Sequence, residues 1–490
     1  MTVGVEAALR PGAHWHCLGI CGYAVSGLAL IARAAGRRVT GSDQDAYPPT
    51  TEILRSAGVP VDPGHDPANL VRHGKVDLLV VGNQVRRGNP EWMAARREGI
   101  PELSEAAAYR ALTAERTRAV VCGTHGKTTT AALLAQILDA GGLRPGVRLG
   151  ATARNLGASA RLGDPTPGSP FVFEGDEYTT TARDRRAKFL WWDPQVVGLL
   201  NLELDHPDVY PDLIHYRRPF HQLVQGLPGH GRLVVNRDDP EALAVARAAP
   251  CPVVTVGRDA GDWHLRAAPT VTGGMTRLEV RAPSGERITV RVPLFGPAGA
   301  TDTLVALAMA DALGVGPAAA AAAAPGYLGL ARRLEWLGSA GGVEVVDDYA
   351  HHPTEVAASL AGLRSRFGPA ARLVMVYVPH TYSRTRALLD DYGGAFRLAD
   401  RVLLGPLEPA RERRRAGAVT SADVAARVRG PRPTLVDDAD QAIRILCREA
   451  RPGDVICCCS VRGFDGCAPR LLAELRQRPH TCIVAPDAPP

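Results

Sequence analysis

The residues around position 125 combine the groups that bind nucleotide phosphates. An apolar segment, 119–122, leads into a glycine-bounded loop that ends in Gly126, Lys127 and Thr128, and a segment that favours a helix, 131–140, follows. Glycine lets backbone N–H groups approach phosphate oxygens, and a helix N-terminus adds partial positive charge. We therefore predict that Lys127 reaches the β- and γ-phosphates of ATP and that the Thr128 hydroxyl binds Mg²⁺.

The loop departs from the strict phosphate-loop pattern at one place, because Val121 stands where that pattern has its first glycine. The lysine is nevertheless informative. The chain has only three lysines, Lys75, Lys127 and Lys188, among its 57 basic residues. A lysine kept in a chain so rich in arginine indicates a position that arginine cannot fill.

Two acidic segments end apolar runs downstream of this loop. The first is Glu174-Gly175-Asp176-Glu177-Tyr178, and the second runs from Asn201 to His206. In open α/β sheets, binding sites form at the carboxyl ends of parallel strands, where acids can hold Mg²⁺ against phosphates. We predict that Thr128, Glu174 and His206 are the metal ligands of a phosphoryl-transfer site.

Strand-like apolar runs alternate with helical segments along almost the whole chain. The expected strands include 76–81, 119–122, 196–200, 232–235, 343–346, 373–377 and 455–459. This alternation predicts an α/β fold with mainly parallel sheets. In segment 271–292 polar and apolar residues alternate around Gly273-Gly274, which indicates a β-hairpin. The chain has 490 residues, and at roughly 100–200 residues per domain this length predicts three domains.

A second glycine-rich turn lies near the N-terminus. A strand-like segment, 14–18, precedes Gly19 and Gly22, and another, 38–43, ends in Asp43. A helix N-terminus followed by an acid about 20 residues on is typical of dinucleotide-binding domains. The glycine spacing, G-x-x-G-x-x-x-x-G, differs from that fingerprint. The pyrophosphate of a nucleotide sugar therefore fits this turn as well as a nicotinamide dinucleotide does.

Composition argues against several classes of protein. Hydrophobic residues make up 46% of the chain and charged residues 22%, which is typical of a globular protein. The formal net charge of +6 is mild for this length and predicts no nucleic-acid partner. We see no secretory signal and no uncharged apolar run of about 18 residues, so we expect a cytoplasmic protein without a membrane partner. The cysteines form no C-x-x-C pair, which argues against a cysteine-based zinc site.

Five segments, in their order and spacing, resemble the Mur ligase family. They are 123–129, Glu174-x-Asp-Glu, Asn201-x-Glu-x-Asp-His206, Arg332-Arg333-Leu334-Glu335 and 347–354, which reads DDYAHHPT. The resemblance covers nearly the whole chain. It implies an ATP-dependent, ADP-forming ligase that converts a carboxylate to an acyl phosphate and joins it to an amine, with ATP and Mg²⁺ as cofactors. It also implies a Rossmann-like UDP-sugar-binding domain at 1–110, a central P-loop ATPase domain at 111–326, and a Rossmann-like amine-binding domain at 327–490.

Within the family, the resemblance points to two different amines. Segments 159–163 and 460–466, among others, resemble members that join the tripeptide L-alanyl-γ-D-glutamyl-meso-diaminopimelate to UDP-N-acetylmuramate. Segment 379–386 resembles members that add L-alanine instead. Both kinds share the sugar nucleotide. The expected partners are therefore a UDP-N-acetylmuramate-type molecule and an amino acid or short peptide, bound by a monomer or weak dimer.

The resemblance also carries roles over to matching residues. The expected catalytic residues are Lys127, Glu174, His206, Arg333 and Asp348. The expected ATP-binding residues are Gly123, Thr124, His125, Gly126, Lys127, Thr128, Thr129, Asp302, Arg333 and Asp348. The expected substrate-binding residues are Gly19, Gly22, Asp43, Asn83, Asn155, His351, His352 and Arg384. Several relatives carry a carbamylated lysine near the second metal ion, and the matching position here is close to Phe220.

One departure from the family concerns adenine. Members usually have His-Asn-x-x-Asn at the start of a helix, and here Ala298, Gly299 and Asp302 replace the histidine and the two asparagines. An ionised Asp only accepts hydrogen bonds, whereas Asn also donates. Besides the tripeptide ligase, we keep three alternatives. They are an L-alanine-adding or natural-product peptide ligase, a nicotinamide-dependent oxidoreductase, and a catalytically weak binding protein.

Overall fold

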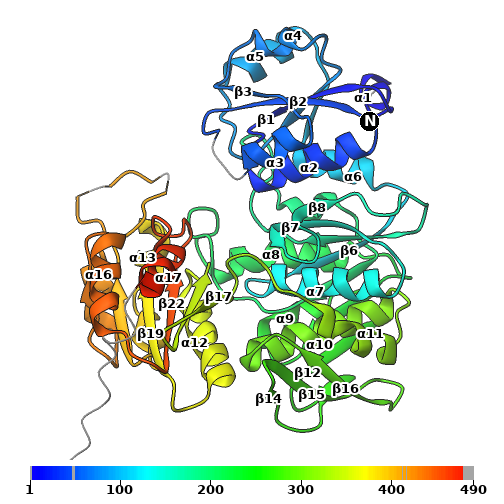
Figure 1. The fold of residues 1–490 in the computed structure, drawn as a ribbon. Coiled ribbons are helices and arrows are strands. Elements are labelled where there is room, and N and C mark those ends of the chain that lie inside the picture. Colours follow the sequence, from blue (N-terminus) through cyan, green and yellow to red (C-terminus); the bar gives the residue numbers. More distant parts are fainter. Residues whose placement is uncertain (1–2, 47–49, 411, 415, 478–490) are drawn as a thin grey trace, which may run out of the picture.

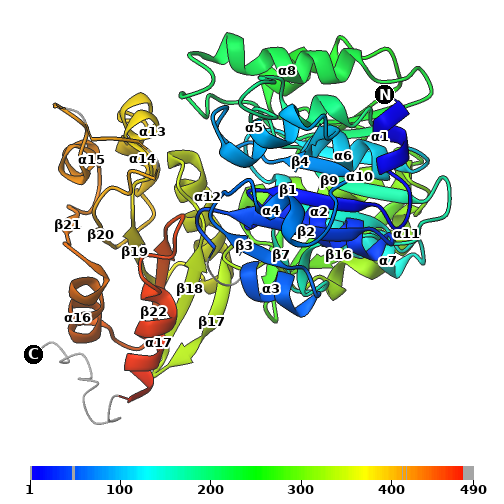
Figure 2. The same ribbon diagram turned by 90° about the horizontal axis from the view of Figure 1, so that it is seen from above.

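The computed structural model describes residues 3–46, 50–410, 412–414 and 416–477. Its strands form three separate sheets, and each sheet lies in its own lobe (Figure 1). We call these the N-terminal, middle and C-terminal lobes. Seen from above, the C-terminal lobe stands to one side of the other two (Figure 2). The expectation of a three-domain α/β fold is confirmed.

The N-terminal lobe contains five parallel strands in the order β3-β2-β1-β4-β5, which is the Rossmann-type order. The strands are β1 (His14–Leu18), β2 (Arg38–Asp43), β3 (Val61–Pro63), β4 (Leu78–Val81) and β5 (Glu102–Ser104). The helices are α1 (Val3–Ala8), α2 (Tyr23–Ala34), α3 (Thr50–Ser56), α4 (Asn69–Arg72), α5 (Pro90–Arg97) and α6 (Glu105–Leu112). Strands β1 and β4 are buried at every residue, as expected for a parallel sheet with helices on both faces.

The middle lobe contains an 11-stranded mixed sheet. Its parallel strands are β6 (Thr117–Cys122), β7 (Gly146–Ala153), β9 (Pro170–Glu174), β10 (Val196–Leu199), β11 (Arg232–Asn236), β12 (Val253–Gly257) and β13 (Trp263–Leu265). The antiparallel strands are β8 (Ala158–Arg161), β14 (Thr270–Thr272), β15 (Met275–Arg281) and β16 (Arg287–Val292). Strands β14 to β16 confirm the hairpin predicted at 271–292.

Helices flank the middle sheet and connect its strands. They are α7 (Lys127–Ala140), α8 (Leu213–Gln225), α9 (Pro240–Ala246), α10 (Gly296–Ala312) and α11 (Pro317–Ala323), with 3-10 turns η1 (Lys188–Trp191) and η2 (Ala324–Gly326). Helix α7 carries leucine and alanine side chains that are buried between the parallel strands and α10. This burial fixes the start of α7 at the end of β6, where the phosphate loop was predicted.

The C-terminal lobe contains six strands in the order β17-β18-β22-β19-β20-β21, of which only β17 is antiparallel. The strands are β17 (Glu335–Ala340), β18 (Val343–Asp348), β19 (Arg372–Tyr377), β20 (Arg401–Leu404), β21 (Thr434–Leu435) and β22 (Asp454–Cys459). The helices are α12 (Pro353–Phe367), α13 (Tyr382–Ala387), α14 (Tyr392–Ala395), α15 (Ser421–Arg427), α16 (Ala439–Glu449) and α17 (Cys467–Gln477).

Close helix packing joins the lobes. Helix α2 of the N-terminal lobe contacts β8, and a Cβ added at Gly27 would lie only 2.9 Å from the Ala160 Cβ. Glycine at this position therefore lets α2 approach the middle lobe. Helices α10 and α12 pack together across the boundary between the middle and C-terminal lobes. None of the helices in the described part of the chain combines the length and apolar character needed to cross a membrane.

The chain between these two lobes is fastened on both sides. The backbone N–H of Ala331 donates to the Thr152 carbonyl in β7 at 3.0 Å. The next residue, Arg332, has φ 55° and directs its guanidinium to the carbonyls of Ser460 and Val461 in the C-terminal lobe. The crossing from one lobe to the other is thus confined to a very short stretch of backbone.

Candidate active site

The loop between β6 and α7 has the geometry of a phosphate-binding loop. Gly123 (φ 135°) and Gly126 (φ 82°) have left-handed backbone conformations. A Cβ at Gly126 would lie 2.3 Å from Asp302 Oδ1, so glycine is required there. Helix α7 begins at Lys127, and the N–H groups of its first turn have no acceptor within the helix. These donors can cradle phosphate oxygens.

Lys127 connects this loop to a buried acid. Its Nζ donates to the carbonyls of Gly123 at 2.7 Å and Thr124 at 2.9 Å, and lies 3.2 Å from the Glu177 carboxylate. Burial disfavours the ammonium form, but Glu177 and the neighbouring acids outweigh this effect and raise the pKa of Lys127. The lysine is therefore held as a cation beside the loop.

Glu177 joins Lys127 to the predicted metal ligand His206. His206 Nε2 lies 3.2 Å from Glu177 Oε1, and the Tyr216 hydroxyl donates to the same oxygen at 3.2 Å. Burial works against ionisation of Glu177, yet Lys127 and His206 lower the pKa of its carboxyl. Glu177 is not among the site residues predicted from the sequence. Only its place in the same acidic segment as Glu174 could have indicated it.

Glu174 lies beside the loop but makes other contacts. It ends β9, where it is paired with Val121 of β6, and its Oε2 accepts a hydrogen bond from Gly150 N at 2.5 Å. Its charge contributes to the raised pKa of Lys127. Within the described ranges, no hydrogen bond or ion pair joins Glu174 to Thr128 or His206, and Thr128 is buried in the first turn of α7. In the described part of the chain, the three predicted metal ligands are therefore not bonded to one another.

His206 occupies a tight turn after β10. Its φ is 53°, and its carbonyl accepts hydrogen bonds from the N–H groups of Val209 and Tyr210. Burial would lower the pKa of the imidazole, but Asp205 and Glu177 raise it. Phe220, near the position expected for a carbamylated lysine, is fully buried against other aromatic rings. This position therefore contributes packing and no metal ligand.

The C-terminal lobe brings Arg384 to this turn. Arg384 lies in α13, and its Nε donates to Asp205 Oδ1 at 2.8 Å while Nη2 lies 3.4 Å from His206 Nδ1. Both side chains of the pair are only 7% exposed. Although burial opposes ionisation of Asp205, His206 and Arg384 lower the pKa of its carboxyl well below the ordinary value. The predicted amine-binding arginine thus touches the predicted metal site.

His351 and His352 lie at the start of α12 and have different environments. His352 caps the helix, since its Nδ1 accepts from Thr354 N at 3.2 Å. The His351 ring packs against Tyr349 and His380, and its Nδ1 lies 3.0 Å from the Tyr349 carbonyl. Burial lowers the pKa of His351 to about 3. A neutral His351 that donates from Nδ1 keeps Nε2 as an acceptor, which can receive a hydrogen bond from an amine.

Arg333 and Asp348, both predicted to bind ATP, have separate partners in the C-terminal lobe. Asp348 accepts hydrogen bonds from the Ser359 hydroxyl at 2.5 Å and from Tyr349 N at 2.8 Å. Burial raises the pKa of its carboxyl. The Arg333 guanidinium stacks over the Tyr349 ring at 4.6 Å. Arg333 therefore keeps its hydrogen-bond donors free of any ion pair within the described ranges, and can turn them to a phosphate.

Asp302 lies on α10 against the phosphate loop. It is buried, and a Cβ at Gly126 would collide with its carboxylate. Burial raises the pKa of Asp302 to about 7, although Thr130 and the nearby His125 work in the opposite direction. The residue that replaces the second asparagine of the adenine segment thus contacts the loop that binds phosphate.

The N-terminal lobe holds its predicted residues around one turn. Asp43 Oδ2 accepts a hydrogen bond from Cys21 N at 2.8 Å, so the acid that ends β2 braces the turn between Gly19 and Gly22. Asn83 is half-buried just after β4. These groups lie at the carboxyl ends of neighbouring parallel strands, where nucleotide ligands bind in this type of sheet.

Asn155 has a different setting from the other predicted substrate-binding residues. Its Nδ2 donates to Gly326 O at 2.7 Å, and its Oδ1 accepts from Leu328 N at 2.7 Å. Both partners belong to the segment that leads to the C-terminal lobe. The side-chain amide therefore holds this segment on the middle lobe.

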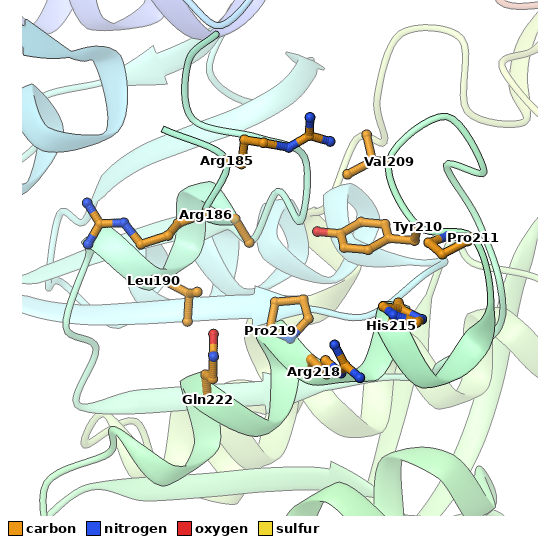
Figure 3. A pocket seen from close by; sticks show the side chains of 11 residues that line it. Arg185, Arg186, Leu190, Val209, Tyr210, Pro211, His215, Arg218, Pro219 and Gln222 are labelled. Atoms are coloured by element: carbon orange, nitrogen blue, oxygen red, sulfur yellow. The ribbon is translucent and has the colours of Figure 1, made fainter. Parts of the chain in front are cut away.

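A pocket outside this cluster opens beside the turn that follows His206 (Figure 3). The loop before η1 supplies Arg185 and Arg186, α8 supplies Arg218, and Tyr210 lies between the loop and the helix. The basic side chains favour an anionic group. Glu177 and Lys127 do not line the pocket, so it is separate from the site described above.

Three family models match the chain, and their order follows the lobes. The Mur ligase family catalytic domain matches residues 14–117, the Mur ligase middle domain matches 121–310, and the Mur ligase glutamate ligase domain matches 332–462. The chain belongs to the Mur ligase family. Members are ATP-dependent, ADP-forming ligases that use Mg²⁺, so this chain is an ATP-dependent carboxylate–amine ligase, as predicted. The oxidoreductase hypothesis is set aside.

Relatives of two kinds match at similar identity. The UDP-N-acetylmuramate–L-alanyl-γ-D-glutamyl-meso-2,6-diaminoheptandioate ligase of Escherichia coli strain K12 is 35% identical over 467 residues, covering 94% of this chain and 98% of the relative. The UDP-N-acetylmuramate–L-alanine ligase of Roseiflexus sp. strain RS-1 is 37% identical over 465 residues, covering 90% of this chain and 95% of the relative. Overall similarity therefore leaves the amine open.

A solved structure supports the arrangement of the lobes. The murein peptide ligase of Psychrobacter arcticus 273-4 matches with a TM-score of 0.70 and 28% identity, covering 96% of this chain and all of that chain. The match extends over all three lobes. It confirms the three-domain Mur ligase architecture expected from the sequence.

Proposed function

We propose that this Mur ligase joins the lactyl carboxylate of a UDP-N-acetylmuramate-type nucleotide to the amine of L-alanyl-γ-D-glutamyl-meso-diaminopimelate. The observation that carries the proposal is the contact of Arg384 with Asp205 and His206. An amine substrate held by the C-terminal lobe would meet, at this contact, a carboxylate activated beside the phosphate loop. The tripeptide named for the relative from Escherichia coli supports this choice of amine.

The reaction would take two steps. The sugar carboxylate attacks the γ-phosphorus of ATP, and ADP leaves. The uncharged amine then attacks the carbonyl carbon of the acyl phosphate, and inorganic phosphate leaves with the electrons of the broken C–O bond. Lys127 and the first N–H groups of α7 would stabilise the charge on the transferred phosphoryl group.

The residues around Lys127 fit a bound Mg²⁺. Thr128 and the carboxylates of Glu174 and Glu177 supply the oxygen ligands that Mg²⁺ prefers, and His206 adds a nitrogen. Glu177 Oε2 is buried and lies 3.2 Å from Lys127 Nζ, so a metal ion bound to it would lie beside the lysine. When bound, the metal would neutralise charge on the phosphates. The contact between the lobes would keep water away from the acyl phosphate.

The test is ADP release with ATP, Mg²⁺ and UDP-N-acetylmuramate, with the tripeptide and L-alanine supplied in separate reactions. We expect release that depends on both the sugar nucleotide and the tripeptide, and a product whose mass equals that of the two substrates joined with loss of water. Lys127→Ala is the inactive control. Release with L-alanine alone would reject the tripeptide, and no release with either amine would reject the sugar nucleotide as well.

The second candidate is an L-alanine-adding ligase. It rests on segment 379–386, which contains Arg384 and resembles the alanine-adding members. Within that segment Thr381 replaces the arginine that those members carry, and it caps α13 by accepting a hydrogen bond from Arg384 N. This departure from the alanine-adding members is the reason to place L-alanine second.

A further inference from the structure

A group of possible metal ligands lies between the middle and C-terminal lobes, apart from the predicted Mg²⁺ ligands. It contains His125 of the phosphate loop, Glu203 of the segment after β10, and His352 at the start of α12. One ligand atom from each residue lies within 4.8 Å of the others. Two of these residues belong to the middle lobe and one to the C-terminal lobe. The group therefore exists only while the lobes are in contact.

Both imidazoles are oriented as metal-binding histidines usually are. His125 points one ring nitrogen towards Glu203, while its Nδ1 lies 3.1 Å from Glu355 Oε1. His352 Nδ1 lies 3.6 Å from Glu203 Oε1, while its Nε2 lies 3.4 Å from the Leu204 carbonyl. In metal sites the second nitrogen of a histidine ligand typically donates to a carboxylate or a backbone carbonyl. Glu355 and the Leu204 carbonyl supply these two acceptors.

The ligand set selects the class of metal. Two imidazole nitrogens and one carboxylate suit Zn²⁺ and similar transition metals, whereas Mg²⁺ prefers oxygen ligands and retains water. Glu203 is 39% exposed, so water can reach a fourth coordination position. Metal binding here would replace the hydrogen bond between His125 and Glu203. It would also replace the bond from Thr354 N to His352 Nδ1.

We propose that His125, Glu203 and His352 bind one divalent transition-metal ion of the Zn²⁺ type, which fastens the phosphate loop to the C-terminal lobe. The ion is distinct from the Mg²⁺ that accompanies ATP, because its ligands do not include Lys127's neighbours Glu177 and His206. Because its ligands come from both lobes, the bound ion holds the two lobes in contact. The site goes beyond the proposed function and requires neither sugar nucleotide nor amine.

The probe is Co²⁺, which reports on geometry through its visible absorption and on thiolate ligands through a charge-transfer band in the near ultraviolet. Purified full-length protein, freed of metal, is titrated with Co²⁺ and then with Zn²⁺ in competition. We expect one tightly bound ion with tetrahedral-type absorption and no thiolate band. His352→Ala and Glu203→Gln should abolish this absorption, and Glu355→Gln should weaken binding by about 10- to 100-fold.

Two controls identify the site. His230→Ala removes an exposed histidine outside the group and should leave the titration unchanged. His206→Ala removes a predicted Mg²⁺ ligand and should also retain the Co²⁺ spectrum. Circular dichroism and thermal unfolding show whether each variant folds. The proposal is overturned if folded wild-type protein binds no Co²⁺ tightly, or if the absorption is lost in His206→Ala and kept in His352→Ala. A thiolate band would overturn it too, and would assign the ion to the buried Asp348, Cys457 and Cys459.

Discussion

Arg384 of the C-terminal lobe and Asp205 of the middle lobe form a buried ion pair, with Arg384 Nε 2.8 Å from Asp205 Oδ1. The pair lies directly beside His206, so the position of one lobe determines which charges surround the predicted metal ligand of the other. A charge left alone in such a place is costly, whereas a complete pair is tolerated. When the lobes separate, the Arg384 guanidinium and the Asp205 carboxylate must therefore both become exposed to water.

Replacement of Arg384 should reduce both stability and amine use. For Arg384→Ala we expect kcat/KM for the amine to fall by about 100-fold or more, and the free energy of unfolding to fall by roughly 3 kcal/mol, because Asp205 loses its partner. Arg384→Lys should recover part of the stability but less of the activity, since lysine lacks the forked donors. Arg386→Ala, on the exposed side of the same helix, is the control. Equal effects of Arg384→Ala and Arg386→Ala would contradict this role.

Lys127 should be essential for phosphoryl transfer, and its loss should also lower stability, because the buried Glu177 loses a cationic partner. We expect Lys127→Ala to lower the rate of ADP release by about 1000-fold, because the transferred phosphoryl group loses its nearest cation. The exposed Lys75→Ala serves as a matched control, since it also removes one of the three lysines. Steady-state ADP release and urea unfolding measure the two effects. Near-normal activity of Lys127→Ala would place the phosphates elsewhere.

Asp302 should make stability depend on pH below neutrality. Burial raises the pKa of Asp302 from 3.8 to about 7, so the folded protein holds a proton that the unfolded chain has already released. The free energy of unfolding should therefore decrease as pH rises from about 4 to about 7, by up to about 4 kcal/mol for this group. Asp302→Asn does not titrate. Its stability relative to the wild type should rise across this window and level off above it.

Urea unfolding of both proteins across this pH range provides the test for Asp302. A stability difference that stays constant with pH would show that the carboxyl does not retain its proton in the folded state. The same variant restores the amide that relatives carry in this place. We also expect it to lower the KM for ATP at neutral pH, because an ionised carboxylate beside the phosphate loop repels the triphosphate.

His125 should also make stability decrease as pH rises, but in a higher pH range than Asp302. Burial disfavours the imidazolium, but hydrogen bonds with Glu203 and Glu355 outweigh it and raise the pKa of His125 from 6.5 to about 9. This stabilisation is fully present below about pH 6.5 and is lost as pH rises through about 9, with a limit of about 3 kcal/mol. The stability advantage of wild type over His125→Asn should shrink accordingly.

Unfolding of wild type and His125→Asn must be followed in EDTA, so that no bound metal contributes. Glu355→Gln is a useful companion, because it removes the charge of one of the two carboxylates beside His125. It should lower the pH-dependent part of the stability difference by at most about half. If the difference between wild type and His125→Asn is the same at both ends of the alkaline range, the contact between His125 and Glu355 does not form in solution.

Local patterns allowed much of the fold to be predicted. Segments 14–18 and 38–43 were expected as strands and are β1 and β2 without change, because apolar runs before glycine or acidic residues end parallel strands. The phosphate loop was predicted for the same reason. Contacts between lobes were not, since His125 and Glu355 are 230 residues apart and no spacing rule relates them. Glu203 and Asp205 were part of a recognised segment, but nothing in it indicated their partners His352 and Arg384 in the other lobe.

Asn155 illustrates the same limit. The resemblance predicts a substrate contact for Asn155, which stays a prediction, and motif spacing did not indicate that its amide bonds to Gly326 and Leu328. That setting depends on the path of the segment between the lobes, which neither hydrophobic periodicity nor motif spacing encodes. The placement of substrates by Asn83, Asp43 and the glycine turn remains a prediction.

The short crossing from Ala331 to Arg332 has a mechanical consequence. Because Ala331 is bonded to the middle lobe and Arg332 to the C-terminal lobe, any swing of the C-terminal lobe pivots within one or two peptide units. Displacement grows with distance from a pivot. Arg333 would hardly move, whereas Arg384 would travel far. A nucleotide in contact with Arg333 would thus stay bound while the amine side of the site opens. The joined product would then leave before ADP.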